Sequence, residues 1–100
     1  MIDWRKVSGF QWDEGNRRKN SDKHDVSQAE AEQVFFNQPL LVAPDVDHSQ
    51  HEPRYHALGV TDDLRLLHVT FTFRELETVL RVISARDMHR KERITYEQST

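Results

Sequence analysis

The sequence predicts a small α+β domain in which one antiparallel sheet carries two N-terminal helices on one face and is followed by a C-terminal helix. Three features of the chain predict this class. Candidate strands follow one another with short connections between residues 54 and 86, and such strands pair antiparallel. Helix signals lie before this block, in residues 13–36, and after it, in residues 89–98. A chain of 100 residues supports a single modest core, so we expect one domain over residues 1–100.

The N-terminal part predicts a short strand and then a helix. Phe10 and Trp12 alternate with small or polar residues, which is typical of a strand whose aromatic side chains point inward. Asp13 is suited to cap a helix that runs through residues 15–24. At Asp25 the end of that helix needs the left-handed backbone conformation, which Asp tolerates.

A second helix is predicted from Ser27, because Ser27 and Glu30 have the spacing of a capping box. Its buried stripe consists of apolar residues at helical spacing, Ala31, Val34 and Phe35. Residues 40–42 then favour a short strand, and residues 43–53 favour a polar loop.

Residues 54–60 and 66–73 predict the next two strands. In the second of these, apolar and polar side chains alternate. The core face is predicted as Leu67, Val69, Phe71 and Phe73, and the opposite face as His68, Thr70 and Thr72. With both helices on the core side, the opposite face of the sheet is expected to be open.

Residues 80–97 carry the strongest functional signal in the chain. Residues 80–85 favour a strand, and Asp87 suits the N-cap of a helix over residues 89–98. Five cations lie on or beside this unit: Arg81, Arg86, Arg90, Lys91 and Arg93. A rigid strand that presents guanidinium groups suits phosphate recognition, and the helix has few apolar residues with which to pack. The alternative is a charged helix that is only solvated.

Composition limits the function classes. The net charge of −3 argues against a general nucleic-acid-binding protein, but residues 25–63 contain eight acidic residues and only one Lys or Arg, Arg54. The two ends of the chain are net basic and could meet as one positive face. The absence of cysteine excludes disulfides and thiolate metal sites. No apolar run has the length of a membrane span and no signal peptide is recognised, so we expect a cytoplasmic protein with no membrane partner.

Several local motifs along nearly the whole chain match one family. They are Phe10-x-Trp-Asp13, Asn20-x-x-Lys-His24, Val26-Ser27, Glu30-Ala31, Val34-Phe35, His48-Ser49, Arg54-Tyr55, Leu58-Gly59, Arg81-Val-Ile-Ser-Ala-Arg86, Arg90-Lys-Glu-Arg93 and Tyr96-Glu97. With these motifs the chain resembles the BrnT toxins. The resemblance implies a RelE-like fold and the ribonuclease half of a bacterial type II toxin–antitoxin pair. It also implies an RNA substrate, inhibition of translation, and a hetero-oligomer with a BrnA-like antitoxin that itself binds DNA.

The chain departs from the family pattern at four positions. Asp25 stands where the family usually has Gly, and Gln28 stands where it has an aromatic residue. Asn16 replaces a frequent lysine, and Pro53 replaces an acidic residue before Arg-Tyr. These departures leave every candidate catalytic cation in place.

RNA cleavage of the kind that the resemblance implies uses the 2′-hydroxyl of the substrate as nucleophile and needs no metal. It requires a group that transfers protons near neutral pH and fixed cations that stabilise the phosphorane. The predicted catalytic residues are His24 for proton transfer, with His48 as a second titratable candidate, and Arg54 and Arg86 as phosphate stabilisers at strand ends. The predicted RNA-binding residues are Lys23, Arg81, Arg90, Arg93 and Tyr96. No metal or other cofactor is expected.

Plainer interpretations exist for several of these residues. Lys23 and His24 suit the end of a helix without any chemistry, and Tyr96 can pack on Arg93 rather than on a base. His56 and His68 alternate within strands and are predicted as residues of the sheet face.

Two further alternatives concern the polar loop and the whole chain. His48 and His51 with Asp45 and Asp47 could be metal ligands, but their spacing matches no compact site and favours a flexible acidic loop. A non-catalytic RNA- or protein-binding module that uses the same basic face is the alternative function.

Overall fold

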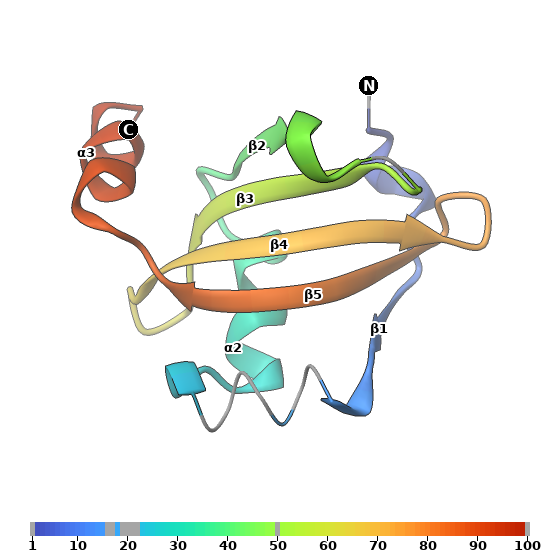
Figure 1. Ribbon diagram of the computed structural model, residues 1–100. Helices are drawn as coiled ribbons and strands as arrows, with labels where there is room; N and C mark the ends of the chain where they lie inside the picture. The colour runs from blue at the N-terminus through green and yellow to red at the C-terminus, as the bar shows by residue number, and fades with distance from the viewer. Residues whose placement is uncertain (1, 16–17, 19–22, 50, 100) are drawn as a thin grey trace.

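Residues 2–15, 18, 23–49 and 51–99 of the chain are described by the computed structural model. They form a five-stranded mixed sheet with strand order β1-β5-β4-β3-β2 (Figure 1). The strands are β1 (Gly9–Trp12), β2 (Leu41–Pro44), β3 (Arg54–Val60), β4 (Leu66–Arg74) and β5 (Val79–Asp87). The helices are α2 (Gln28–Gln33) and α3 (Arg90–Gln98), with 3-10 turns η1 (Trp4–Lys6), η2 (Val34–Phe36) and η3 (Val46–His48). Within these residues no helix has the length and apolar character needed to cross a membrane.

The sheet is mixed because of its first strand. Strands β2 to β5 form the predicted antiparallel succession, but β1 pairs with β5 in parallel, with Gly9 opposite Val79 and Trp12 opposite Val82. The prediction of a purely antiparallel sheet is therefore wrong at this edge. Short connections enforce antiparallel pairing between consecutive strands, whereas β1 and β5 are distant in sequence and their relative direction is free of that constraint.

Helix α2 begins at the predicted capping box. Ser27 Oγ accepts a hydrogen bond from Glu30 N, and the Glu30 carboxylate accepts one from Ser27 N. Ala31 and Val34 are fully buried against the sheet. Gly59 of β3 permits this contact, because a Cβ at that position would collide with the Val34 side chain. Helix α2, together with Val34 of the following turn η2, therefore covers one face of the sheet, behind β3 to β5 in the view of Figure 1.

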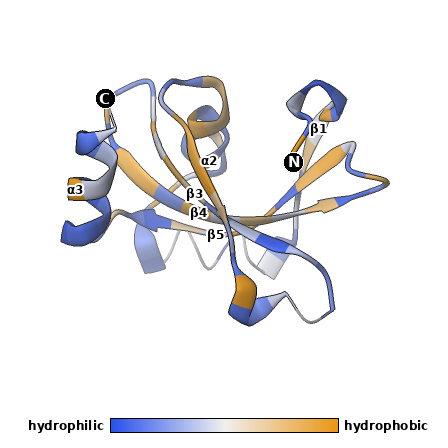
Figure 2. Ribbon diagram, turned by 90° about the horizontal axis from the view of Figure 1, so that it is seen from above, coloured by the Kyte–Doolittle hydropathy of each residue, from blue (hydrophilic) through white to orange (hydrophobic). Residues whose placement is uncertain are grey.

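The core lies between this helix and the sheet. Its fully buried members are Val26, Ala31, Val34, Ala57, Leu67, Val69, Phe71, Leu80, Val82 and Ala85. The strands carry most of the apolar residues, as the colouring of Figure 2 shows. Phe10 and Trp12 pack against this core from β1, as their alternation predicts.

Part of the first predicted helix lies outside the described residues, which exclude 16, 17 and 19–22 and therefore Asn16 and Asn20. The described helical residues of this segment are Glu14, Gly15, Arg18, Lys23 and His24. The predicted left-handed position is confirmed, because Asp25 has φ 53°.

Strand β4 shows the predicted alternation, with one irregularity. Leu67, Val69 and Phe71 are buried on the α2 side. Between Thr70 and Phe71 the register shifts, because Thr70 pairs with Ser84 and Phe71 with Val82, which leaves Ile83 as an extra residue in β5.

The face opposite α2 is less open than predicted. His68, Thr70 and Thr72 lie on this face, yet each is at most 9% exposed. Thr72 Oγ1 donates a hydrogen bond to Pro53 O, so the loop before β3 folds over one end of the face. Helix α3 stands at the other end (Figure 2).

Helix α3 begins later than a helix capped by Asp87, which was the predicted N-cap, would begin. His89 is the N-cap and Asp87 is the last residue of β5. The Asp87 carboxylate instead binds Arg65, with 2.8 Å between Arg65 Nε and Asp87 Oδ1. The helix also packs better than its composition suggested, because Tyr96 is 4% exposed and its hydroxyl donates to Pro39 O at 2.6 Å.

Candidate functional site

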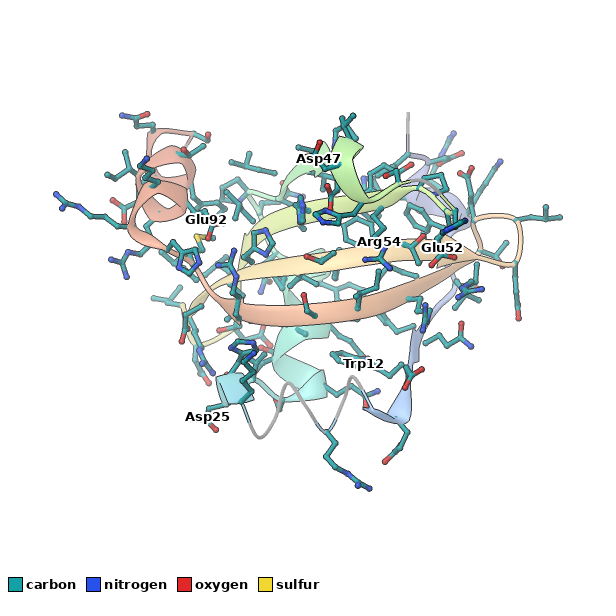
Figure 3. All side chains as sticks on the ribbon, in the orientation of Figure 1. Trp12, Asp25, Asp47, Glu52, Arg54 and Glu92 are labelled. Atoms are coloured by element: carbon teal, nitrogen blue, oxygen red, sulfur yellow. The ribbon has the colours of Figure 1, made fainter. Side chains whose placement is uncertain are left out.

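Polar side chains form three cross-strand rows on the face opposite α2. The first row joins Arg54, Thr72 and Arg81 across β3, β4 and β5. The second row is His56, Thr70 and Ser84, and in the third row Leu58 is followed by His68 and Arg86. We call the eight polar residues of these rows the polar strip. Figure 3 shows Arg54 near one end of this face and Glu92 of α3 near the other.

His56 is at the centre of the polar strip and both of its ring nitrogens have partners. Nδ1 lies 3.1 Å from Thr70 Oγ1, and Nε2 lies 3.1 Å from Asp45 Oδ2. A carboxylate only accepts hydrogen bonds, so Nε2 carries the proton and Nδ1 of the neutral ring is the acceptor. The His56 side chain is 37% exposed, which leaves it open to a ligand on this face.

Asp45 anchors this arrangement from the loop after β2. Its carboxylate also binds His48 Nδ1 at 3.0 Å and accepts a hydrogen bond from His48 N. Burial works against ionisation of Asp45, yet the hydrogen bonds from His48 and the electrostatic interactions with His56 and His48 leave its pKa lowered overall. Asp45 thus joins this part of the loop to His48 and to His56 of β3, a set of contacts that composition did not indicate.

His68 lies beside His56, with 4.8 Å between the two ring centroids. Burial, with a smaller contribution from the Arg86 charge, lowers the pKa of His68 from 6.5 to about 4. Its Nδ1 is buried without a hydrogen-bond partner among the described residues. His68 is therefore uncharged at neutral pH and is a poor proton donor there.

The buried His68 predicts a pH dependence of stability. Because its pKa is lower in the folded protein, the unfolded chain binds the proton first as the pH falls. The free energy of unfolding is thus expected to decrease from about pH 6.5 to about pH 4. His68→Gln should remove a contribution on the order of 2–3 kcal/mol to this decrease, as urea unfolding across the range measures. Exposed His51→Gln is the control, and equal pH slopes in wild type and His68→Gln would contradict the assignment.

Arg86 and Glu92 form a bidentate pair at the α3 end of the strip. Arg86 Nη1 lies 2.8 Å from Glu92 Oε1, and Arg86 Nη2 lies 3.0 Å from Oε2. Mainly because of this hydrogen-bonded guanidinium, the pKa of Glu92 falls from 4.5 to about 2. Glu92 Oε1 also accepts a hydrogen bond from His89 N at 2.8 Å, so the same carboxylate caps α3. The pair fixes the guanidinium of Arg86 at the edge of the face.

Arg54 and Arg81 form the cationic end of the strip. Arg81 lies 3.5 Å from Asp13 Oδ2 and 3.7 Å from Glu52 Oε1. Arg54 lines a hollow of about 370 Å³ with residues of the preceding loop, among them His51 and Glu52. Within the described residues no ion pair of the Arg54 guanidinium occurs, so this cation is available to an anionic ligand.

His24 and Lys23 lie on the other side of the sheet. Arg65 Nη2 donates to His24 O at 3.3 Å, and the same guanidinium binds Asp87. Asp87 and Arg86 are successive residues of an extended strand, so their side chains point to opposite faces. Figure 3 places the neighbouring Asp25 below the sheet, near α2. The structure does not bring His24 and Lys23 together with the polar strip.

The remaining predicted RNA-binding residues are on α3. Arg90 and Arg93 are exposed. Tyr96 instead faces inward, where burial raises the pKa of its hydroxyl. Its ring is thus inaccessible for stacking on a base in this structure, contrary to the prediction, because the hydroxyl reaches Pro39 O.

Sequence reasoning missed the centre of the site. His56 and His68 were predicted to be on the sheet face, which is confirmed. Their pairing, and the contact of His56 with Asp45, were not predicted. Alternation could have placed both imidazoles with Thr70, whereas nothing in the spacing indicates that Asp45 folds back onto His56. Among the described residues no three His, Cys, Asp or Glu side chains are grouped as a metal site.

Comparisons with known proteins agree with the fold. A family model described as the ribonuclease toxin BrnT of type II toxin–antitoxin systems matches residues 12–92. The chain is also similar to the 1.1 Å crystal structure of the Brucella abortus ribonuclease toxin BrnT, with a TM-score of 0.64 and 26% identity. That match covers 84% of this chain and 100% of the other. A comparison with curated proteins finds no match. The family match includes the whole polar strip and Asp45.

Proposed function

This chain belongs to the BrnT family of ribonuclease toxins of type II toxin–antitoxin systems, and we propose that it cleaves RNA at the polar strip with His56 as the proton-transferring group. The observation that carries the proposal is the Asp45–His56–Thr70 arrangement. It lies between Arg54 and Arg81 on one side and Arg86 on the other. An imidazole between fixed cations is what metal-free phosphodiester cleavage requires.

The proposed reaction begins with the 2′-hydroxyl of the substrate. His56 Nδ1, which faces the Thr70 hydroxyl in the free protein, takes the proton of the 2′-hydroxyl as the 2′-oxygen bonds to phosphorus. The bond from phosphorus to the 5′-oxygen then breaks, and that oxygen takes the proton back from the His56 imidazolium. This restores the neutral ring and leaves a 2′,3′-cyclic phosphate and a 5′-hydroxyl. Asp45 fixes the tautomer of His56 and stabilises the imidazolium that forms. We therefore assign proton transfer to His56 rather than to His24.

The cations of the polar strip have the proposed role of binding phosphate. Arg54 and Arg81 lie in one cross-strand row through Thr72, so one phosphate group can contact both guanidiniums. Arg86 lies in the third row, where Glu92 holds it in a fixed position. Charge that develops on the phosphorane is stabilised best by donors that need no rearrangement. Arg90 and Arg93 extend the positive surface along α3 and are proposed to bind flanking phosphates.

The family implies an antitoxin partner as well as an RNA target. We propose that the antitoxin is BrnA-like, that it forms a hetero-oligomer with this chain and binds DNA itself, and that unrestrained cleavage inhibits translation. These assignments rest on the family resemblance. A partner that covers the polar strip would block RNA by occupancy alone.

Metal independence is the direct test of the proposed reaction. Purified protein, freed of any partner, should cleave RNA in the presence of EDTA and leave 2′,3′-cyclic phosphate ends, because the proton acceptor and the cations all come from side chains. Analysis of the fragment ends by mass spectrometry is the measurement. Cleavage that stops with chelator and returns only with a divalent ion would contradict the mechanism.

A further inference from the structure

A cavity of about 320 Å³ lies between helix α3 and the β2–β3 edge of the sheet, directly beside His56. Its apolar wall consists of Leu41, Val42, Ala43 and Leu58. In the sheet, Leu41 pairs with Leu58 and Ala43 pairs with His56, so His56 adjoins this wall. His56 therefore lines the cavity and is at the same time a member of the polar strip.

The cavity suits a flat aromatic ligand. The imidazoles of His56 and His68 line it, with 4.8 Å between their centroids and 40° between their planes. Unstacked RNA bases bind proteins mainly by packing on such rings and on apolar side chains, and by hydrogen bonds at their edges.

Glu92, Thr95 and His56 present acceptors to the cavity rather than free donors. Glu92 Oε1 already accepts from Arg86 and His89. Within the described residues Oε2 accepts one hydrogen bond, from Arg86 at 3.0 Å, and His68 Nε2 lies beyond hydrogen-bond distance at 3.9 Å, so Oε2 retains acceptor capacity. The Thr95 hydroxyl donates to Lys91 O at 3.1 Å, so it presents lone pairs to a ligand. Both ring nitrogens of His56 are engaged. A ligand bound here must supply the donors.

We propose that this cavity binds the base of the nucleotide whose 2′-hydroxyl reaches His56, and that it selects bases with an exocyclic amino group over uracil. Adenine, cytosine and guanine each offer an amino group to Glu92 Oε2 and Thr95. Uracil offers one ring N–H between two carbonyl oxygens, which would face the carboxylate. The inference rests on the proposed function, because it takes His56 as the cleaving group.

The test is the identity of the 3′-terminal nucleotide on fragments of an RNA that contains every dinucleotide equally. Wild-type protein should produce A, C or G ends about tenfold more often than U ends, which is the discrimination typical of a well-placed hydrogen-bonded base contact. Thr95→Val removes an acceptor while keeping the side-chain shape, and should reduce the ratio to about threefold or less. Thr78→Val makes the same change in the β4–β5 turn, outside the cavity, and should leave the ratio unchanged.

The outcomes separate the two proposals. Equal frequencies of all four ends, with cleavage that still depends on His56, overturn the base-recognition inference and leave the proposed function standing. A preference for U ends also overturns it. Failure of the wild-type protein to cleave RNA at all overturns the proposed function, and the inference with it.

Discussion

Arg54→Ala is expected to lower the rate of RNA cleavage about 10²–10³-fold, which is the loss typical of removing one preorganised stabiliser of an oxyanion. The free energy of unfolding should stay close to that of wild type. Among the three arginines of the polar strip, Arg81 and Arg86 form ion pairs, whereas Arg54 has none within the described residues, so its removal leaves no unpaired partner. Initial rates on a short RNA, together with urea unfolding, measure both quantities. Arg5→Ala removes the same charge from an exposed side chain that is paired with Asp3 and does not belong to the strip, and should change the rate by less than about twofold.

Arg86→Ala should give a similar loss of rate but a different effect on stability. Glu92 is 24% exposed and would lose the guanidinium that neutralises it. We therefore expect a stability loss of about 1–3 kcal/mol, because a half-buried carboxylate would be left without its partner. If Arg54→Ala and Arg86→Ala both retain more than half of the wild-type rate, the polar strip is not where the phosphorane forms.

Local signals were sufficient to predict much of the fold. The strand over residues 54–60 and the capping box at Ser27 both appear as predicted, because each depends on residues close in sequence. The parallel pairing of β1 with β5 depends on residues about 70 positions apart and has no local signal. For the same reason the prediction of an antiparallel sheet was right for β2 to β5 only.

The site was harder to predict than the fold, for a physical reason. Alternation along a strand assigns each side chain to a face, and it correctly placed His68 on the face away from α2 and both His56 and His68 on the sheet surface. Which residues then meet is decided by the register between strands and by loops. The register brings His56 against Thr70, and the loop after β2 brings Asp45 to its other nitrogen. Composition alone had indicated a flexible loop there.

The C-terminal helix shows the same limit. Its cations were predicted to bind RNA, and Arg90 and Arg93 are exposed, as that prediction requires. Tyr96 was predicted to bind RNA together with them, but it points inward, where Pro39 O, 57 residues earlier in the chain, accepts a hydrogen bond from its hydroxyl. Spacing within one helix cannot tell which face meets the rest of the protein.

His56→Ala is expected to reduce RNA cleavage about 10²–10⁴-fold, the usual contribution of a general acid–base group. His56 is partly exposed, and Asp45 keeps His48 as a partner when the ring is removed. The variant should therefore remain folded. His24→Ala tests the competing assignment, and His51→Ala removes an exposed histidine as the control.

The comparison of His56→Ala with His24→Ala on one RNA substrate, at equal concentrations of folded protein, tests the central assignment most directly. We expect cleavage to be lost in His56→Ala and retained within about twofold in His24→Ala, because His56 lies between the cations of the polar strip and His24 does not belong to the strip. Retained cleavage in His56→Ala with lost cleavage in His24→Ala would contradict the account and place the reaction on the helix α2 side of the sheet.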